Sequence, residues 1–530
     1  MSKPPPRFTH HSVHYHPDAS ALFNRLGATT APDSVLLESV DITTRSGLRS
    51  VAVLSASLRV TCNGSRVRVD PLTASGHVIA AQLREDLAPY AVAEHEYEFP
   101  PAAADNERER LTAASTAEVL RALTTHADRT YHNEDFPMLA GGFAFDYLET
   151  FEQLPAVGEG ANTYPDYQFI LAEVLLKVDH QQQHAYLTAL DATGEGIDLT
   201  AYAQQIAGLT TKAHPAPAAT TTSSPTSSPT PSPERLVVQA EVDDEGFRGG
   251  VEKLKSSIHD GDIYQVVPAR SFTTQCPDAF AAYQRLRETN PSPYMFYVRG
   301  VDRGAQPYEL FGASPESSLQ FDAATRQVQL YPIAGTRPRG LNPDGSVNHE
   351  LDARMELQLR TDAKEVAEHT MLVDLARNDM ARVAAPGTRK VAELLQVDRY
   401  SRVMHLVSRV TARLAEDLDA LDAYRACMNM GTLTGAPKLR ATELLREFEG
   451  TRRGSYGGAV GYLHGSGDFD TCIVIRSAYV TGGTAVVQAG AGVVRDSNPQ
   501  AEADETLHKA YAVLHALAQA AAATTTEVAR

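Results

Sequence analysis

The segment 213–234, AHPAPAATTTSSPTSSPTPSPE, most constrains how this chain of 530 residues can fold. It consists almost entirely of Pro, Ala, Ser and Thr, a composition that cannot bury enough apolar area to offset the entropy lost on ordering. We therefore predict a disordered linker or surface insertion here, between an N-terminal domain (20–212) and a C-terminal domain (235–515). The ends, residues 1–19 and 516–530, are predicted to be flexible tails.

The charge balance excludes a nucleic-acid partner. The chain has 48 basic and 66 acidic side chains, a formal net charge of −18, and no run of clustered Lys and Arg. Its cysteines are few, far apart and without a CxxC pair, which predicts reduced thiols and a cytoplasmic location. The N-terminus lacks the apolar core of a signal peptide, and no apolar run approaches the ~20 residues of a membrane span.

Both halves of the chain mix strand and helix patterns. SLRVTCNGSRVRVDPL alternates around Asn-Gly, which predicts a hairpin, and TCIVIRSAYV and TAVVQAGAGVV are strand-like. Helical patterns of 15 residues or more cover 351–380 and 499–518. Adjacent strands between long helices favour an α+β fold.

Two pairs of glutamates are candidates for a metal site. Glu365 and Glu368 are three residues apart on the helical stripe that carries Leu372, so both should face the interior, which is costly without a compensating cation. Glu502 and Glu505 lie near the start of the second helix, where acidic residues also complement the helix dipole. Ligands that offer only oxygen favour Mg²⁺.

A pocket for an anionic substrate is indicated by arginines and glycine-rich loops. In LYPIAGTRPRG the backbone amides of Gly335 and Thr336 accompany the guanidinium groups of Arg337 and Arg339, and Arg476 ends another strand. Glycines at 490 and 492, and glycines beside Tyr456, allow close approach of a ligand. Together these features predict a substrate with more than one carboxylate. By themselves His405, Glu316 and Lys438 stay ambiguous between structural and catalytic roles.

These stretches, in this order, closely resemble anthranilate synthase component I of the chorismate-utilising enzymes. The matching motifs lie between about 245 and 510: GDIYQVVPAR, NPSPYMFY, FGASPESSL, PIAGTRPRG, DAKEVAEHTMLVDLARND, YSRVMHLVSRV, MGTLTGAPKLRA, RGSYGGAVGY, TCIVIRS and QAGAGVVRDSNPQAEADET. The resemblance implies a four-layer α/β/β/α fold with two packed central β-sheets. The N-terminal half matches more loosely, chiefly through LLESVD at 36–41.

The resemblance also implies roles for the candidate residues. Both glutamate pairs become a Mg²⁺ site, with Glu368 and Glu505 as direct ligands. Glu316 falls where the family has a general acid for the C4 hydroxyl, and His405 where pyruvate elimination is assisted; Thr434 and Lys438 complete the catalytic set. The positions that match chorismate-binding ones are Gly335, Thr336, Tyr456, Arg476, Gly490, Ala491 and Gly492.

Two further positions indicate which reaction is catalysed. Relatives that aminate chorismate at C4 carry a nucleophilic Lys at the position of Ala334, and those that add water place a Lys base at the position of Gln265. Glutamine has no titrating proton to serve as that base. This leaves ammonia attacking C2, so we expect conversion of chorismate and ammonia to anthranilate and pyruvate, with ammonia supplied from glutamine by a separate amidotransferase subunit, commonly in a heterotetramer.

A regulatory site for L-tryptophan is implied by the same resemblance. Its expected residues are Glu38, Ser39, Arg49, Pro293, Tyr294, Met295 and Cys472. Two alternatives stay open. One is an aminodeoxyisochorismate synthase of secondary metabolism, which stops before pyruvate loss; the other is a non-catalytic, tryptophan-sensing paralogue.

Overall fold

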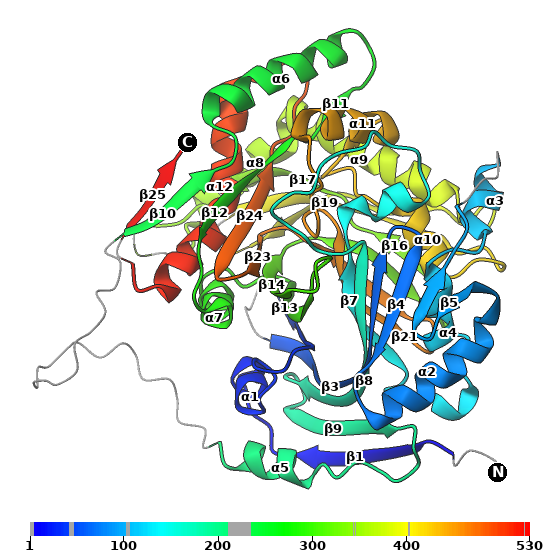
Figure 1. The fold of residues 1–530 in the computed structure, drawn as a ribbon. Coiled ribbons are helices and arrows are strands. Elements are labelled where there is room, and N and C mark those ends of the chain that lie inside the picture. Colours follow the sequence, from blue (N-terminus) through cyan, green and yellow to red (C-terminus); the bar gives the residue numbers. More distant parts are fainter. Residues whose placement is uncertain are drawn as a thin grey trace, which may run out of the picture.

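The computed structural model describes residues 5–41, 47–101, 106–209, 235–342, 344, 346–400, 403–523 and 525–530 (Figure 1). The predicted linker 213–234 lies outside the described residues. The helices are α1 (Ala19–Arg25), α2 (Ala74–Asp86), α3 (Glu107–Thr112), α4 (Ala117–Leu123), α5 (Thr200–Ala207), α6 (Asp244–His259), α7 (Ala279–Thr289), α8 (His349–Thr361), α9 (Ala363–Ala381), α10 (Ala420–Cys427), α11 (Lys438–Glu449) and α12 (Pro499–Ala520), with short 3₁₀ turns η1 (Ala88–Tyr90), η2 (Arg129–Tyr131) and η3 (Phe145–Thr150).

The strands run from one end of the chain to the other. They are β1 (Arg7–Val13), β2 (Ser34–Val40), β3 (Gly47–Asn63), β4 (Arg66–Pro71), β5 (Ala91–Ala93), β6 (Glu96–Glu98), β7 (Met138–Phe143), β8 (Tyr167–Asp179), β9 (His184–Asp191), β10 (Arg235–Ala240), β11 (Gln265–Val266), β12 (Ala269–Gln275), β13 (Tyr294–Val301), β14 (Pro307–Ser314), β15 (Ser317–Asp322), β16 (Gln327–Leu330), β17 (Ile333–Pro338), β18 (Lys390–Arg399), β19 (Val403–Arg413), β20 (Gly435–Ala436), β21 (Ala459–His464), β22 (Phe469–Ile473), β23 (Ser477–Thr481), β24 (Thr484–Gly490) and β25 (Thr525–Ala529).

Two long strands, β3 and β8, connect two arrays of antiparallel strands. On the side of β3 the neighbours follow in the order β2, β13, β14, β23, β24, β12 and β10. On the side of β8 they follow as β7, β21, β22, β15, β16 and β19. Two arrays can share these strands because β3 spans 17 residues and β8 spans 13.

Three apolar clusters define the layers. The central cluster joins residues of both arrays, among them Val53, Leu175, Phe296 and Val460. A second packs the first array against α1, α7 and α12, and a third packs the other array against α2, α4 and α10. The order helix, sheet, sheet, helix confirms the expected α+β fold with four layers, α/β/β/α.

The two predicted domains share their sheets. Leu37 of β2 pairs with Phe296 of β13, and Gly142 of β7 pairs with Val460 of β21. Residues 20–212 and 235–515 therefore do not fold around separate cores, although the composition of 213–234 suggested a division.

The prediction of flexible tails is wrong at both ends. Strand β1 pairs with β9 over seven residues, and His10 stacks on Tyr186 with ring centres 5.0 Å apart. At the other end α12 continues to Ala520, and β25 pairs with β10 in parallel. Pairing at a sheet edge uses backbone groups, so polar and Ala/Thr-rich ends that have little to bury can still be ordered there.

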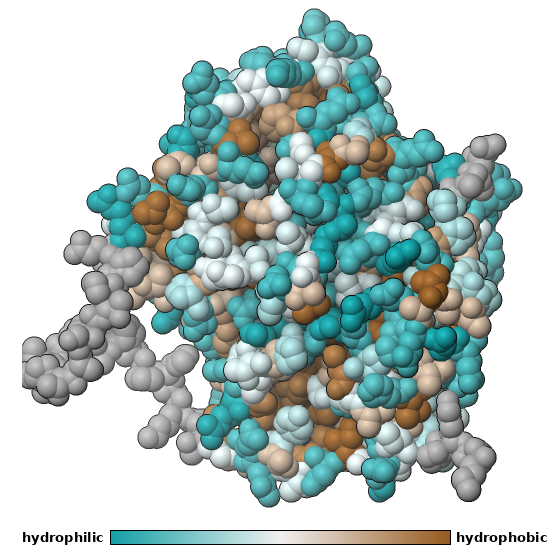
Figure 2. All heavy atoms as spheres, viewed as in Figure 1, coloured by the Kyte–Doolittle hydropathy of each residue, from teal (hydrophilic) through white to brown (hydrophobic). Residues whose placement is uncertain are grey.

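The surface is largely hydrophilic on the face shown in Figure 2, where apolar residues lie mostly singly or in small groups. No helix in the described part of the chain is long and apolar enough to cross a membrane. All four cysteines are buried and carry free thiols.

Candidate functional site

The first two turns of α9 and of α12 carry the four candidate glutamates. Each helix begins with a side-chain cap: Asp362 accepts from the amides of Lys364 and Glu365, and Asn498 accepts from those of Gln500 and Ala501. The loop of β17 lies beside α9, because a Cβ added to its Gly335 would lie 3.2 Å from Glu365 Oε2.

Glu368 is a half-buried glutamate with only one long ion pair. Burial raises the pKa of its carboxyl group, Lys364 at 3.6 Å partly offsets this, and repulsion by Glu365 and Glu502 adds to it. Its Oε1 is buried without a hydrogen-bond partner. A buried carboxylate oxygen with only a long ion pair to Lys364 and two carboxylates nearby is what a bound cation would stabilise.

Glu502, rather than Glu505, shares this buried environment. Glu502 is 6% exposed, and burial, followed by repulsion from Glu505, raises its pKa against a hydrogen bond from Ser497. Glu505 already pairs with Lys509 at 2.7 Å, as Glu365 pairs with Arg337 at 2.8 Å. Within the described residues no three acidic, His or Cys side chains already form a cation cage. The donor set fits a metal that keeps water or substrate ligands, as Mg²⁺ does.

Arg476 is an unpaired cation inside the site. It follows β22 with φ of +51°, and no hydrogen bond or ion pair of its guanidinium with another described residue is found. Burial lowers its pKa, which Tyr456, Glu316 and Glu505 counteract. A guanidinium held without a carboxylate partner is suited to bind an anionic ligand in a bidentate manner.

The glycine-rich loops approach this arginine from two strands. Burial raises the pKa of Tyr456 to about 12, so its phenol stays protonated and lies near Gly490, where an added Cβ would be 3.2 Å from the hydroxyl oxygen. An added Cβ at Gly492 would lie 3.0 Å from Gln265 Nε2. Side chains at these glycines would fill the space beside Tyr456 and Gln265.

Glu316 is a buried acid that is protonated at neutral pH. Burial raises its pKa to about 8, against hydrogen bonds from Thr432 and from the backbone of Ile333. The Thr432 hydroxyl donates to Glu316 Oε1 at 3.2 Å. A carboxylic acid with this pKa can donate a proton to a leaving group at pH 7. The sequence did not indicate Thr432, because no pattern distinguishes this threonine from its neighbours.

His405 of β19 faces the same site in its neutral form. Its Nδ1 lies 2.9 Å from the Thr336 hydroxyl oxygen, and Tyr400 stands edge-on to its ring at 5.1 Å. Burial, and then the charge of Arg476, lower its pKa to about 4. A neutral imidazole can accept a proton during a reaction at pH 7.

Several predicted groups already have partners. Arg337 pairs with Asp362 at 2.6 Å as well as with Glu365, and Arg339 pairs with Asp352 at 2.7 Å, so neither guanidinium is free for a substrate. The carboxylate partners of both arginines lie outside the LYPIAGTRPRG motif, so the motif alone could not show that these guanidinium groups are paired. The loop still offers the Thr336 hydroxyl, which lies 2.9 Å from His405 Nδ1.

Two predicted catalytic side chains hold the loop 428–437 in place. Lys438 Nζ donates to Asp379 at 2.6 Å and to the Cys427 carbonyl at 2.7 Å, and the Thr434 hydroxyl donates to the Met430 carbonyl at 3.1 Å. Both are buried in structural bonds, while the loop they support presents Thr432 to Glu316.

A separate cavity of about 330 Å³ contains part of the predicted regulatory set. Glu38, Ser39 and Met295 line it, together with His180 and Arg287, which the sequence did not indicate. Inside it Glu38 accepts from the Tyr283 hydroxyl at 2.5 Å and pairs with Arg287 at 3.0 Å.

The other predicted regulatory residues are not among those that line this cavity. Tyr294 donates to Asp470 at 3.1 Å, and Cys472 is buried in the core between the sheets. Arg49 has an exposed side chain 3.8 Å from Asp179, and Pro293 does not line the cavity. Adjacent residues of a strand alternate between its faces, so PYM cannot place Tyr294 and Met295 on the same side.

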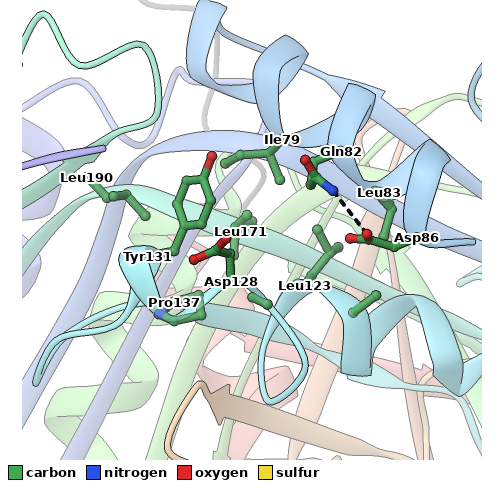
Figure 3. A pocket seen from close by; sticks show the side chains of 12 residues that line it. Ile79, Gln82, Leu83, Asp86, Leu123, Asp128, Tyr131, Pro137, Leu171 and Leu190 are labelled. Atoms are coloured by element: carbon green, nitrogen blue, oxygen red, sulfur yellow. Dashed lines mark hydrogen bonds between the residues drawn. The ribbon is translucent and has the colours of Figure 1, made fainter. Parts of the chain in front are cut away.

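A smaller hollow lies between α2 and the segment 122–137 (Figure 3). Its volume of about 30 Å³ is room for a single water, its walls are mainly apolar, and Gln82 donates to Asp86 at 3.0 Å at its edge. It is a packing gap and contains none of the candidate residues.

Comparison with known proteins identifies relatives over nearly the whole chain. Residues 79–515 match the family model of chorismate binding enzymes. The chain is 47% identical to anthranilate synthase component 1 of Vibrio cholerae, over 96% of this chain and 95% of that protein, and 46% identical to that of Escherichia coli, over 96% of each.

Solved structures share the fold. Anthranilate synthase component I from Streptococcus pneumoniae superposes with a TM-score of 0.66 at 27% identity, covering 88% of this chain and 92% of that one. The menaquinone-specific isochorismate synthase MenF of Escherichia coli gives 0.64 at 19% identity, covering 97% and 95%.

Proposed function

Because this chain belongs to the family of chorismate binding enzymes, we propose that it is the large subunit of an anthranilate synthase, a lyase that converts chorismate and ammonia to anthranilate and pyruvate. One observation carries the proposal: a protonated carboxylic acid, Glu316, and a guanidinium without a carboxylate partner, that of Arg476, lie in the same site. One group can protonate a leaving hydroxyl, and the other can hold a carboxylate.

The residues of the chain divide the reaction between them. Arg476 and the Thr336 hydroxyl bind carboxylates and orient chorismate, which lowers the entropic part of the barrier. Glu316 protonates the C4 hydroxyl as it leaves while ammonia attacks C2, and Thr432 positions the acid. Neutral His405 then accepts a proton as pyruvate is eliminated.

Mg²⁺ is the proposed cofactor. Glu368 and Glu502 would hold it, with Glu505 and Glu365 beside them, because Glu368 has a buried oxygen without a hydrogen bond and Glu502 is its buried neighbour. When bound, Mg²⁺ neutralises the negative charge of a substrate carboxylate and helps to position it.

Two side chains support ammonia over the other nucleophiles of this family. Ala334 has no amine, and its carbonyl is 3.1 Å from His369 Nδ1. Gln265 is buried beside Gly492, and its Oε1 has no hydrogen-bond partner, so it brings a polar amide instead of a base to the site. The proposed source of ammonia is a glutamine amidotransferase subunit, and cytoplasmic assembly with it is part of the same proposal.

Feedback by L-tryptophan is proposed for the cavity of about 330 Å³. The buried Glu38 would receive the ligand ammonium group, and Arg287 would face its carboxylate. The proposal is supported by the size of this cavity, which is large enough for an amino acid, and by the acidic and basic side chains that line it.

The decisive test uses the purified chain with chorismate, Mg²⁺ and an ammonium salt. Anthranilate fluorescence that needs all three, and that Glu316→Gln abolishes, is the expected result. Chorismate consumed without fluorescence would instead indicate the aminodeoxyisochorismate synthase, whose product keeps the pyruvyl group. If chorismate is not consumed at all, the result would indicate the non-catalytic paralogue. Suppression of the fluorescence by tryptophan, lost in Glu38→Ala, tests the regulatory cavity separately.

A further inference from the structure

The largest of the cavities described, about 550 Å³, belongs to neither site discussed above. The turn Gly64–Ser65, residues 99–101, residues 114–116 and the segment 149–156 surround it, and α10 and α11 each contribute one arginine, Arg425 and Arg446. Its volume lies within the range of about 300–1,000 Å³ of small-molecule sites.

Arg425 is a buried cation without a carboxylate partner. It is 3% exposed and lines the cavity. Its Nη1 donates to the Leu111 carbonyl at 2.8 Å, its Nε has no partner, and its guanidinium carbon lies 4.7 Å from the centre of the Phe151 ring. No ion pair with another described residue is found for it; Asp422, which pairs with Arg121 at 2.6 Å, attracts it from a longer distance and compensates its charge only in part.

The surroundings of Arg425 suit a carboxylate with an apolar body. Phe99, Pro100 and Leu154 provide apolar walls, and Ser115 contributes a buried hydroxyl that also lacks a partner. A carboxylate at this place would satisfy an unpaired cation and an unpaired hydroxyl at once.

The other charges of the cavity are mostly compensated. Glu149 pairs with Arg446 at 2.7 Å and also with Arg452, and Arg446 further pairs with Asp146 at 3.2 Å. Glu152 is half-buried, and no ion pair with a described residue is found for it. It is therefore the one acidic group that would oppose a bound anion.

From these contacts we propose that this cavity is a binding site for a small organic carboxylate with an apolar body, held by Arg425 and Ser115. The site is separate from the substrate pocket, and its existence does not depend on the reaction proposed above.

The test is a calorimetric titration of the full chain with benzoate and with its neutral analogue benzamide. Arg476 also offers benzoate a guanidinium, so the titrations use Arg476→Gln as the background, with saturating tryptophan to fill the regulatory cavity. We expect benzoate to bind and benzamide to bind at least tenfold more weakly, because a charge-assisted pair contributes about 1.5–3 kcal/mol.

Two substitutions that each remove a charge give opposite predictions. Arg425→Gln should weaken benzoate binding by tenfold or more, and Glu152→Gln should strengthen it several-fold because it removes the opposing charge. Equal affinity of the background and Arg425→Gln proteins would overturn the proposal, as would the absence of benzoate binding to the background protein.

A third variant covers the case in which Arg425→Gln does not fold. Ala156→Trp keeps the arginine but fills the cavity from an exposed loop position. It should abolish benzoate binding with an unchanged melting temperature; binding as strong as in the background protein would place the benzoate elsewhere and refute the assignment.

Discussion

At the scale of single residues, burial sets the protonation states on which the proposed chemistry depends. Glu316 and His405 are ordinary titratable residues in the sequence, and the same cause, loss of solvent, moves their pKa values in opposite directions, to about 8 and about 4. Each is thereby neutral at pH 7, one as a proton donor and the other as an acceptor. Two groups with pKa values pushed apart are typical of acid and base assignments.

The first prediction concerns the pH dependence of Glu316. Since the acid must be protonated, kcat/KM should fall as pH rises through about 8, the pKa of the free protein. Glu316→Gln should lower kcat by a factor of about 10²–10⁴ and remove this limb from the remaining activity. Steady-state assays between pH 6 and 10 measure both, and an unchanged alkaline limb in the variant would show that another group causes it.

The same residue has a predicted effect on stability. The pKa of Glu316 is about 8 in the folded state and 4.5 in the unfolded state. Below pH 4.5 the carboxyl group is protonated in both states and does not destabilise the fold. As pH rises from 4.5 to about 8, the free energy of unfolding falls, because only the unfolded state releases the proton. Glu316→Gln avoids this loss and should be more stable at pH 7 by on the order of 3 kcal/mol. Urea unfolding at pH 5 and pH 8 should show a gain that grows with pH.

At the scale of elements, α9 and α12 contribute to the site through their first two turns. Both are capped helices, and both aim glutamates at one place from segments more than 130 residues apart. Sequence periodicity located α12, but it merged α8 and α9 into one helix over 351–380, which the structure divides at Asp362. It could not rank the glutamates, because the ion pair of Glu365 with Arg337 joins separate elements and the burial of each carboxylate depends on packing.

This difference gives a metal-binding prediction. Glu368→Gln and Glu502→Gln should each weaken Mg²⁺ binding tenfold or more, and Glu505→Gln should weaken it less. Without Mg²⁺, Glu368→Gln should raise the melting temperature, because it removes a repelled, buried carboxylate. Calorimetric Mg²⁺ titration and thermal unfolding measure these effects. A larger loss of Mg²⁺ affinity in Glu505→Gln than in Glu502→Gln would favour Glu505 as the direct ligand, as the family resemblance implies.

The ion pair of Lys438 with Asp379 ties α11 to α9. Lys438→Met should cost about 3–5 kcal/mol of unfolding free energy, because it leaves Asp379 buried and unpaired. The double variant with Asp379→Leu should recover much of that loss. Denaturant unfolding of both proteins checks this; a double variant as unstable as the single one would mean that the lysine acts through its bond to the Cys427 carbonyl instead.

At the scale of the whole molecule, the two halves of the chain build common sheets. Strands β2 and β7 from the first half each pair with a strand of the second half, and residues of both halves fill the core between the sheets. The fold therefore requires both segments, although only the second carries the clear chorismate motifs.

Deletion of residues 1–13 tests the role of the N-terminal strand. Removing β1 exposes the edge of β9 and its unpaired backbone groups, so the melting temperature should fall and aggregation on heating should increase. The control His10→Ser/His11→Ser keeps the strand and should melt within a few degrees of the unchanged chain. If the deletion leaves the melting temperature unchanged, β1 does not stabilise the fold.

The sequence by itself determined the family, the α+β class and the helical regions that carry the two glutamate pairs, since these follow from local pattern and motif order. Only the tertiary structure decided which charges are already compensated. It showed Arg337, Arg339 and Lys438 in ion pairs, Arg476 without one, and Tyr294 and Met295 on opposite sides of a strand. The physical reason is that a side chain's partner and its burial depend on residues far away in the chain, and these set its charge state and its availability to a ligand.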